Sequence, residues 1–158
     1  MAAMKYSTSP EAAREKTRGF SLIEVLVAMT IIAILAAIAY PSYTTYVTRT
    51  KRNAAKSFLV RVADRQEQFF LDNKQYAPNL SGLGLAADVV GVSENGDELP
   101  AGDADRVYLV TLANTSATTY TVAAVPQLVQ AKHDTKCGTL SLTHAGQRNQ
   151  SGMGTNCW

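Results

Sequence analysis

Hydrophobic residues follow three different patterns along the 158-residue chain. From Phe20 to Tyr40 they are almost continuous: 18 of 21 residues are apolar, and the exceptions are Ser21, Glu24 and Thr30. After residue 47 they recur at helical spacings, and after residue 106 they fall in short runs rich in β-branched and aromatic side chains. This order predicts a long N-terminal helix followed by a β-sheet.

The continuous apolar segment is long enough to cross a membrane. A helix of this length spans about 30 Å, the thickness of the hydrocarbon core of a bilayer. Basic residues precede it, which predicts that the N-terminus stays in the cytoplasm and the remainder is exported. Cys137 and Cys157 lie in the exported part, where two cysteines most simply form a disulfide. Closing this loop stabilises a fold by about 3 kcal/mol.

The second half of the predicted helix, to about Leu71, is amphipathic. Its apolar residues lie seven, four, four and seven positions apart and predict a stripe that packs against the sheet: Val47, Ala54, Phe58, Val62 and Phe69. The basic residues lie largely off this stripe: Arg49, Lys51, Arg52, Lys56, Arg61 and Arg65. Such a run usually forms a solvated helix face or pairs with neighbouring subunits. Because residues 49–56 closely follow the apolar segment, nucleic acid or lipid headgroups are alternative contacts.

Pro41 interrupts this helix. Proline lacks the backbone donor and clashes with the preceding turn. We therefore expect a helix kink or a locally unwound stretch near residues 37–41, rather than a complete break.

Residues 73–105 are predicted to form a loop, because glycine and proline recur through them. This loop is acidic and has no Lys or Arg between Gln75 and Asp105; its acidic residues are Asp88, Glu94, Asp97, Glu98, Asp103 and Asp105. Carboxylates at this density are candidate calcium ligands, but the EF-hand spacing is absent. A solvated loop is the favoured interpretation.

Four short strands are predicted after this loop: residues 107–112, 120–125, 139–143 and a shorter one near 147–149. Short connections favour an antiparallel meander with one face over the helix stripe. The expected fold class is α+β, a long N-terminal helix packed on an antiparallel sheet of about four strands, with a C-terminal disulfide loop.

No motif typical of an enzyme is found, since the sequence lacks a nucleophile elbow, a P-loop, a dinucleotide fingerprint and the H-E-x-x-H pattern. By residue type, zinc is conceivable at His133, Cys137, His144 and Cys157. Their spacing lacks a C-x-x-C pair, and an oxidising compartment favours the disulfide. We therefore expect no enzymatic activity, no cofactor and no metal.

The start of the apolar segment contains a further signal. Ala37-Ile38-Ala39 permits cleavage as an ordinary secretory signal, but that peptide would be unusually long and would carry Glu24 in its apolar region. An acidic residue there costs about 2.5 to 3.5 kcal/mol, so a function is expected for it. The string Lys16-Thr17-Arg18-Gly19-Phe20-Ser21-Leu22-Ile23-Glu24-Val25 resembles the class III signal of type IV pilins. The resemblance continues through Ala33–Ala39 to Pro41-Ser42-Tyr43.

This resemblance implies cleavage by a prepilin peptidase after Gly19 and N-methylation of Phe20. It also implies an assembly role for Glu24, because a carboxylate in apolar surroundings needs a cationic partner and the amino group of a neighbouring subunit's Phe20 supplies one. The implied partners are other pilin subunits, the prepilin peptidase and the pilus assembly machinery at the inner membrane. The subunit is expected in the inner membrane, single-pass with its N-terminus inside, and then in the extracellular filament.

The last third of the chain resembles PilE-like minor pilins, including ComP-like DNA-uptake pilins. The matching residues are Tyr120-Thr121-Val122, Pro126, Cys137–Leu142, Gly146–Arg148 and Cys157-Trp158. DNA contacts are therefore weighed at Lys132, Lys136 and Arg148, near His133. Asp134 opposes them, few aromatic residues interleave them, and the chain without its leader is neutral. Ordinary surface residues near a structural disulfide are the favoured interpretation.

The expected organisation is a leader (1–19), the membrane and filament-core half of the helix (20–48) and a globular head (49–158). The head comprises the amphipathic helix half (49–72), the acidic loop (73–105) and the sheet with the disulfide (106–158). The favoured function is a structural minor pilin for pilus biogenesis, twitching motility, adhesion or surface sensing. A DNA-binding subunit at the pilus tip is the first alternative, and a type II secretion pseudopilin is the second.

Overall fold

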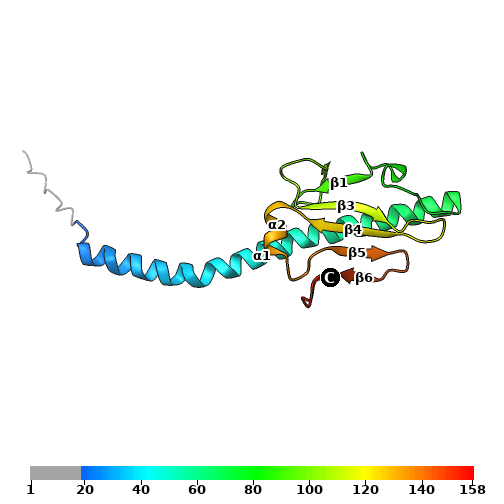
Figure 1. Cartoon of the computed structure of the whole chain (residues 1–158). Coiled ribbons are helices and arrows are strands. Elements are labelled where there is room, and N and C mark those ends of the chain that lie inside the picture. The colour runs from blue at the N-terminus through cyan, green and yellow to red at the C-terminus, as the bar shows by residue number, and fades with distance from the viewer. Residues whose placement is uncertain (1–18) are drawn as a thin grey trace, which may run out of the picture. The chain divides into compact units, whose positions relative to one another are not determined.

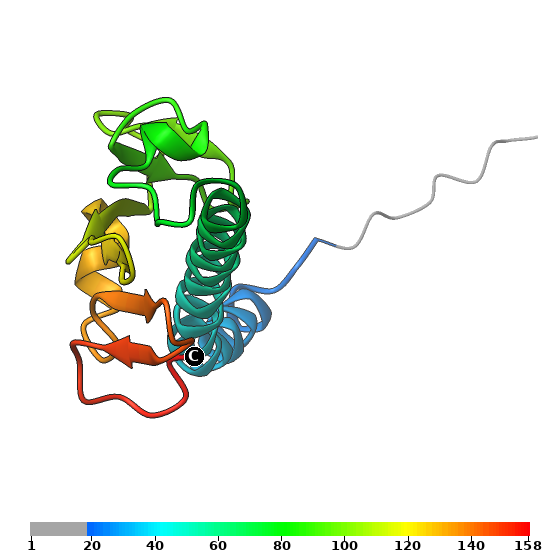
Figure 2. The same cartoon turned by 90° about the vertical axis from the view of Figure 1, so that its right-hand side faces the viewer.

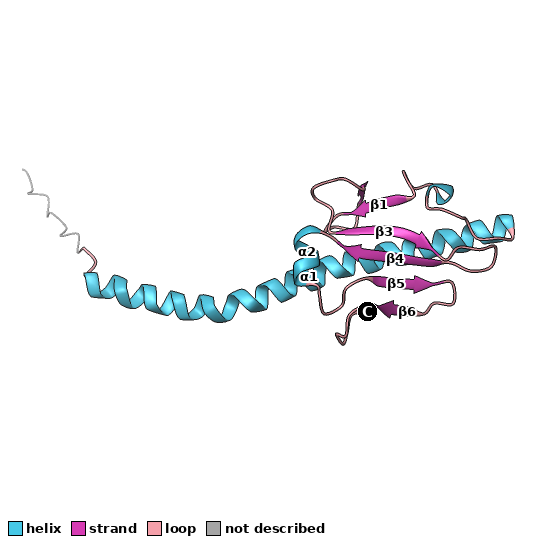
Figure 3. Cartoon of the chain, in the orientation of Figure 1, coloured by secondary structure: helices cyan, strands magenta, loops and turns pink. Residues whose placement is uncertain are grey.

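The computed structural model describes residues 19–158, so all but the last residue of the predicted leader (1–19) lies outside the described residues. The described chain consists of the long helix α1 (Leu22–Asn73), a sheet of six antiparallel strands, the short helix α2 (Leu128–His133) and a 3-10 turn at Ser81–Leu83 (Figures 1 and 3). Contacts within the chain divide it into two compact units. The first unit ends at Ile38, and the second begins at Ala39.

The first unit carries the apolar half of α1. The helix begins after Ser21, whose carbonyl accepts bonds from the amides of Glu24 and Val25 at 3.0 and 3.2 Å. Large apolar side chains are exposed throughout this half, and Phe20 is 83% exposed. By length and composition this helix is able to cross a membrane. A helix with an apolar surface on all sides needs lipid or other subunits around it.

The second unit begins within α1, which continues through Pro41 as a helix. The hydroxyls of Thr44 and Thr45 donate to the Pro41 carbonyl at 2.9 and 3.0 Å. The helix is therefore continuous through residues 37–41, and the locally unwound stretch that was one alternative is not formed there. The kink at Pro41 stays a prediction.

The sheet has six strands rather than about four. They are β1 (Val89–Val92), β2 (Glu98–Pro100), β3 (Tyr108–Ala113), β4 (Thr121–Pro126), β5 (Leu140–Thr143) and β6 (Arg148–Gln150), in the order β2-β1-β3-β4-β5-β6. The four predicted strands correspond to β3–β6. The two additional strands form a hairpin in which Gly91 pairs with Leu99, inside the segment predicted to be a loop. Both are short, and β2 ends in a proline, which an edge strand tolerates.

The core lies between one face of the sheet and the second half of α1, and Figure 2 shows the strands on one side of this half of the helix. Phe58 and Val62 are buried as predicted, whereas Val47, Ala54 and Phe69 are only partly buried. The buried positions of α1 are Thr48, Arg52, Ala55, Phe58, Leu59, Val62 and Gln66. The buried stripe of α1 thus includes polar residues, because their polar atoms form hydrogen bonds with buried groups. Gln66, for example, bonds the amide and the carbonyl of Ala77 at 2.8 and 3.0 Å.

The predicted disulfide joins Cys137 to Cys157. Glycines allow the last segment to lie directly on the backbone around Cys137. Gly152 and Gly154 donate to the carbonyls of Cys137 and Lys136 at 3.0 and 2.6 Å. A Cβ atom at Gly152 would overlap the Lys136 carbonyl, so the disulfide region has one fixed position beside β5 and β6.

Candidate functional site

The basic residues singled out in the sequence are distributed over two hollows beside α1. Lys136 lines a hollow of about 360 Å³, together with residues of α1 and of the last segment. Arg148 lines a second hollow of about 340 Å³. Lys132 is exposed on α2 and lines neither of them.

The helix contributes a cation to each hollow, and both belong to the basic run 49–56, for which a solvated face was the favoured expectation and nucleic acid or lipid headgroups were the alternative contacts. Arg49 lines the hollow of Lys136, and Lys56 lines the hollow of Arg148. The α1 residues of the two hollows include Thr45, Arg49, Arg52, Lys56 and Val60, whose spacings of four, three, four and four place them on one helix face. We call the surface formed by Arg49, Lys56, Lys136 and Arg148 the basic face.

An aromatic side chain lies within the basic face. Trp158 lines the hollow of Arg148 and Lys56, and its indole donates to the Asn149 carbonyl at 2.8 Å. The guanidinium carbon of Arg148 lies 5.7 Å from the centre of the Trp158 ring, within the range of a cation–π contact. Few aromatic residues lie next to these basic residues in the sequence. Trp158 comes close to α1 only in the folded chain, because β6 and the disulfide bring it there.

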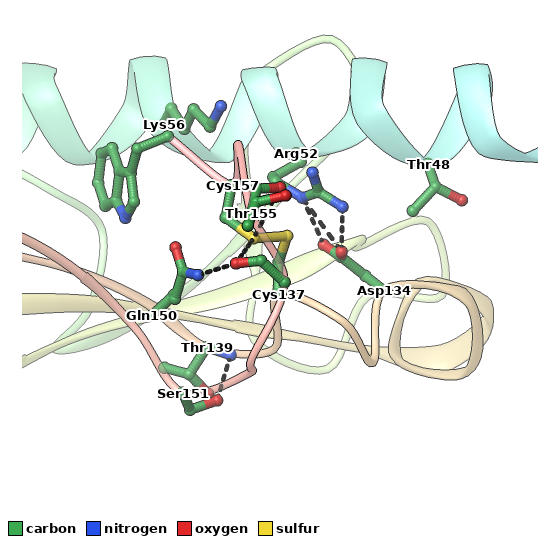
Figure 4. The surroundings of a disulfide bond; sticks show 12 residues. Thr48, Arg52, Lys56, Asp134, Cys137, Thr139, Gln150, Ser151, Thr155 and Cys157 are labelled. Atoms are coloured by element: carbon green, nitrogen blue, oxygen red, sulfur yellow. Dashed lines mark hydrogen bonds and ion pairs between the residues drawn. A yellow bond between two sulfur atoms is a disulfide. The ribbon is translucent and has the colours of Figure 1, made fainter.

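Asp134 does not oppose the basic face, contrary to the sequence-based expectation. It is fully buried, and its carboxylate accepts bonds from Arg52 Nε at 3.1 Å to each oxygen and also from Arg52 Nη2 (Figure 4). Tyr108 donates its hydroxyl to the same carboxylate, and Gln130 Nε2 approaches it at 3.3 Å. Arg52 and Asp134 therefore neutralise each other beneath the surface.

The cations of the basic face have no acidic partner within 4.0 Å among residues 19–158, where the ion pairs are Arg52–Asp134 and Lys51–Glu94. Partial burial lowers the pKa of the Lys56 ammonium group, and the neighbouring positive charges of Arg52 and Arg49 lower it further. At Arg52, burial opposes the charged form, but the bonds to Asp134 outweigh it and raise the pKa. Positive charge is thus concentrated beside α1.

Three of the acidic residues of 73–105 are held in separate local contacts. Glu94 pairs with Lys51 at 3.2 Å, Asp88 accepts the hydroxyl of Ser81 at 2.6 Å, and Glu98 accepts the amide of Ala86 at 2.7 Å. Within residues 19–158, no three His, Cys, Asp or Glu side chains come together as a metal site. Both cysteines of the zinc set considered from the sequence are in the disulfide.

The predicted processing and assembly residues lie at the start of the described chain. Gly19 and Phe20 precede α1, and Glu24 lies in its first turn. All three are exposed, so they are accessible to an enzyme or to another subunit.

Two regions of the chain match known families. Residues 14–40 match the family model described as the prokaryotic N-terminal methylation motif. Residues 41–141, more than half of the chain, match the model described as "Type IV minor pilin ComP, DNA uptake sequence receptor". No curated protein matches the chain. The second match includes α1 from Pro41, Lys132 and Lys136, and ends before Arg148 and Trp158.

Proposed function

Because the chain belongs to the family of ComP type IV minor pilins, we propose that its globular head binds DNA through the basic face. The protein is a minor pilin, anchored in the membrane by its N-terminal helix and then assembled into an extracellular pilus. DNA binding is the specific role proposed for the head, whereas the filament positions it outside the cell.

The observation that carries the proposal is the alignment on one surface of four cations that have no acidic partner within 4.0 Å in the described part of the chain. Two of these cations, Arg49 and Lys56, lie on α1, and the other two, Lys136 and Arg148, lie in the C-terminal segment. Together they line the two hollows, which adjoin each other along the same helix face. Lys and Arg contact backbone phosphates, which supply most of the affinity of DNA-binding proteins. Trp158 adds a ring on which an exposed base can stack.

The neutrality of the chain without its predicted leader does not weaken the proposal. Asp134 is turned inward to Arg52, and the carboxylates of Asp88, Glu94 and Glu98 lie in their own contacts. A local concentration of one charge sign attracts a polyanion even when the net charge is near zero. The charge pattern therefore supports DNA binding better than the sequence average does.

We further propose that assembly uses the residues implied by the pilin resemblance. A prepilin peptidase cleaves after Gly19, Phe20 is N-methylated, and Glu24 pairs with the terminal amine of a neighbouring subunit. A carboxylate among apolar side chains is stable as an ion only with such a partner. Mass spectrometry of the mature N-terminus tests the first step: the proposal expects methylated Phe20, and cleavage after Ala39 would reject it.

A purely structural subunit, serving twitching motility, adhesion or surface sensing, is the alternative function. It requires the same helix but no DNA contact by the head. The family match favours both pilus roles over the type II secretion pseudopilin.

Retardation of labelled duplex DNA by the full-length chain in neutral detergent micelles separates these functions. The proposal expects binding at low salt and its loss in the double variant Lys136→Glu, Arg148→Glu. Lys74→Glu is the matched control, because Lys74 is an exposed cation at the far end of α1 that lines neither hollow. Equal retardation by all three proteins, or none by the unmodified chain, contradicts DNA binding by the basic face.

A further inference from the structure

The hollow that contains Lys136 has the polarity of an anion site. Arg49 and Lys136 are exposed cations in its wall, and neither has an acidic partner among residues 19–158. Arg52, which also lines it, is already neutralised by Asp134. The hollow therefore presents two uncompensated positive charges.

The remaining lining groups restrict what this site is able to hold. The hydroxyls of Thr44, Thr45 and Thr48 donate to carbonyls of their own helix at 2.9, 3.0 and 2.8 Å, so their protons are in use. The side-chain donors that remain in the lining are the charged groups of Arg49 and Lys136, with the imidazole of His133, the hydroxyl of Thr155 and the amide of Asn156 as neutral ones. Charged donors on several sides of a small polar hollow suit a phosphate group, whose oxygens accept several bonds at once.

The position of the hollow on α1 indicates the source of that phosphate. Arg49 follows Tyr40, the last residue of the apolar segment, by nine residues of continuous helix, which corresponds to about 14 Å. Helical side chains lean toward the N-terminus, which brings the guanidinium nearer to the apolar end. Headgroups extend about 5–7 Å beyond the hydrocarbon on each side, and the Debye length at physiological salt is about 8 Å. Arg49 thus lies within electrostatic reach of lipid phosphates.

Three tyrosines on the helix segment from Tyr40 to Arg49 support this placement of Arg49 close to the lipid phosphates. Tyr40, Tyr43 and Tyr46 are 72%, 67% and 70% exposed, although each carries a large aromatic ring. Exposed tyrosine is typical of the layer where a membrane meets water, because the ring is apolar and the hydroxyl is polar. The hollow begins at Thr44, so it starts within this tyrosine-bearing segment.

We propose that this hollow binds the phosphate of an anionic phospholipid while the subunit is still anchored in the membrane. The lipid is one of the leaflet that faces the head, and Arg49 and Lys136 neutralise its phosphate. The proposal requires the membrane-anchored state of the pilin and does not depend on DNA binding. Because both cations also belong to the basic face, a lipid phosphate in the hollow excludes a DNA phosphate from the same place.

Native mass spectrometry of the full-length chain, released from neutral detergent micelles that contain equal amounts of phosphatidylglycerol and phosphatidylcholine, tests the proposal. Each cation near a membrane surface contributes about fivefold to the binding of anionic lipid. We therefore expect phosphatidylglycerol to exceed phosphatidylcholine on the unmodified chain by about tenfold or more, and the double variant Arg49→Gln, Lys136→Gln to show almost no preference.

The control is Lys132→Gln, which removes one positive charge from a residue close to Lys136 in the sequence but outside the hollow, and it should keep the preference. Equal binding of the two lipids by the unmodified chain would overturn the proposal. So would an equal loss of preference in Lys132→Gln and the double variant, since that would indicate general charge attraction. Displacement of the lipid by an equal concentration of inorganic phosphate would assign the hollow to free phosphate and would also overturn it, whereas retention of the lipid supports it.

Discussion

The guanidinium of Arg52 and the carboxylate of Asp134 form a buried ion pair that connects the middle of α1 to the residue that follows α2. Asp134 is inaccessible to solvent and Arg52 is 8% exposed. Asp134 also accepts the amides of Cys137 and Gly138 through its backbone carbonyl, at 3.2 and 2.8 Å. The pair therefore holds the segment that carries Lys136 and Cys137 against the helix.

Replacing Asp134 by Asn should destabilise the head strongly, because Arg52 would keep a buried charge without a counter-ion. Breaking a buried pair in this way costs about 3–5 kcal/mol. Denaturant unfolding of the full-length chain in neutral detergent, followed by near-ultraviolet circular dichroism, measures this loss. The control is Glu94→Gln, which breaks the exposed pair with Lys51 and should cost less than about 1 kcal/mol. A similar effect of both substitutions would show that the Arg52–Asp134 pair does not hold the segment.

The disulfide should contribute a comparable amount to the same region. Replacing Cys137 and Cys157 by Ser opens a loop with a sequence separation of 20 residues, for which chain entropy gives about 3 kcal/mol. The measurement is the free energy of unfolding of the double variant, compared with the unmodified chain before and after reduction. A reduced chain as stable as the oxidised one would contradict a structural role for this bond.

Most of the framework could be predicted from the sequence, and the missing parts have physical reasons. Strands β3–β5 alternate or contain runs of β-branched residues, whereas β1 and β2 are short and lie among glycines, prolines and acidic residues that otherwise indicate a loop. Arg52 was placed off the packing stripe because a charged residue is buried only with a partner, and that partner is 82 residues away. The sequence singled out Lys136, Arg148 and the basic residues of 49–56 separately, but it could not show that they share one surface, because Trp158 and Arg148 reach Lys56 only through the sheet and the disulfide.

The head should lose stability as the pH rises above about 10. Burial raises the pKa of the hydroxyls of Tyr108 and Tyr120 above the ordinary value for tyrosine. The unfolded chain releases these protons near pH 10 while the folded chain keeps them, so stability that is fully present below pH 10 declines above it. Unfolding measured from pH 8 to 11 tests this sign. Tyr120→Phe should give a shallower decline, and an equal slope for both proteins would show that Tyr120 does not contribute.

Replacing Glu24 by Ala should reduce the amount of this subunit in sheared pili by about tenfold or more. A charge-assisted bond contributes about 1.5–3 kcal/mol, and 1.4 kcal/mol corresponds to a factor of ten. Immunoblots of the pilus and membrane fractions measure the change, with Ser21→Ala, directly before α1, as a control. Undiminished incorporation of the Glu24 variant would contradict pairing with a neighbouring amine.

The salt dependence of DNA affinity tests the role of the basic face most directly. For duplex DNA the logarithm of the binding constant falls with the logarithm of salt concentration by about 0.9 per neutralised phosphate. If Arg49, Lys56, Lys136 and Arg148 each neutralise one phosphate, the slope for the full-length chain is about −3.6. Replacing Lys136 and Arg148 by Gln should bring the slope to about −1.8, while Lys74→Gln leaves it unchanged. A slope that is the same in all three proteins would contradict the assignment of DNA binding to this surface.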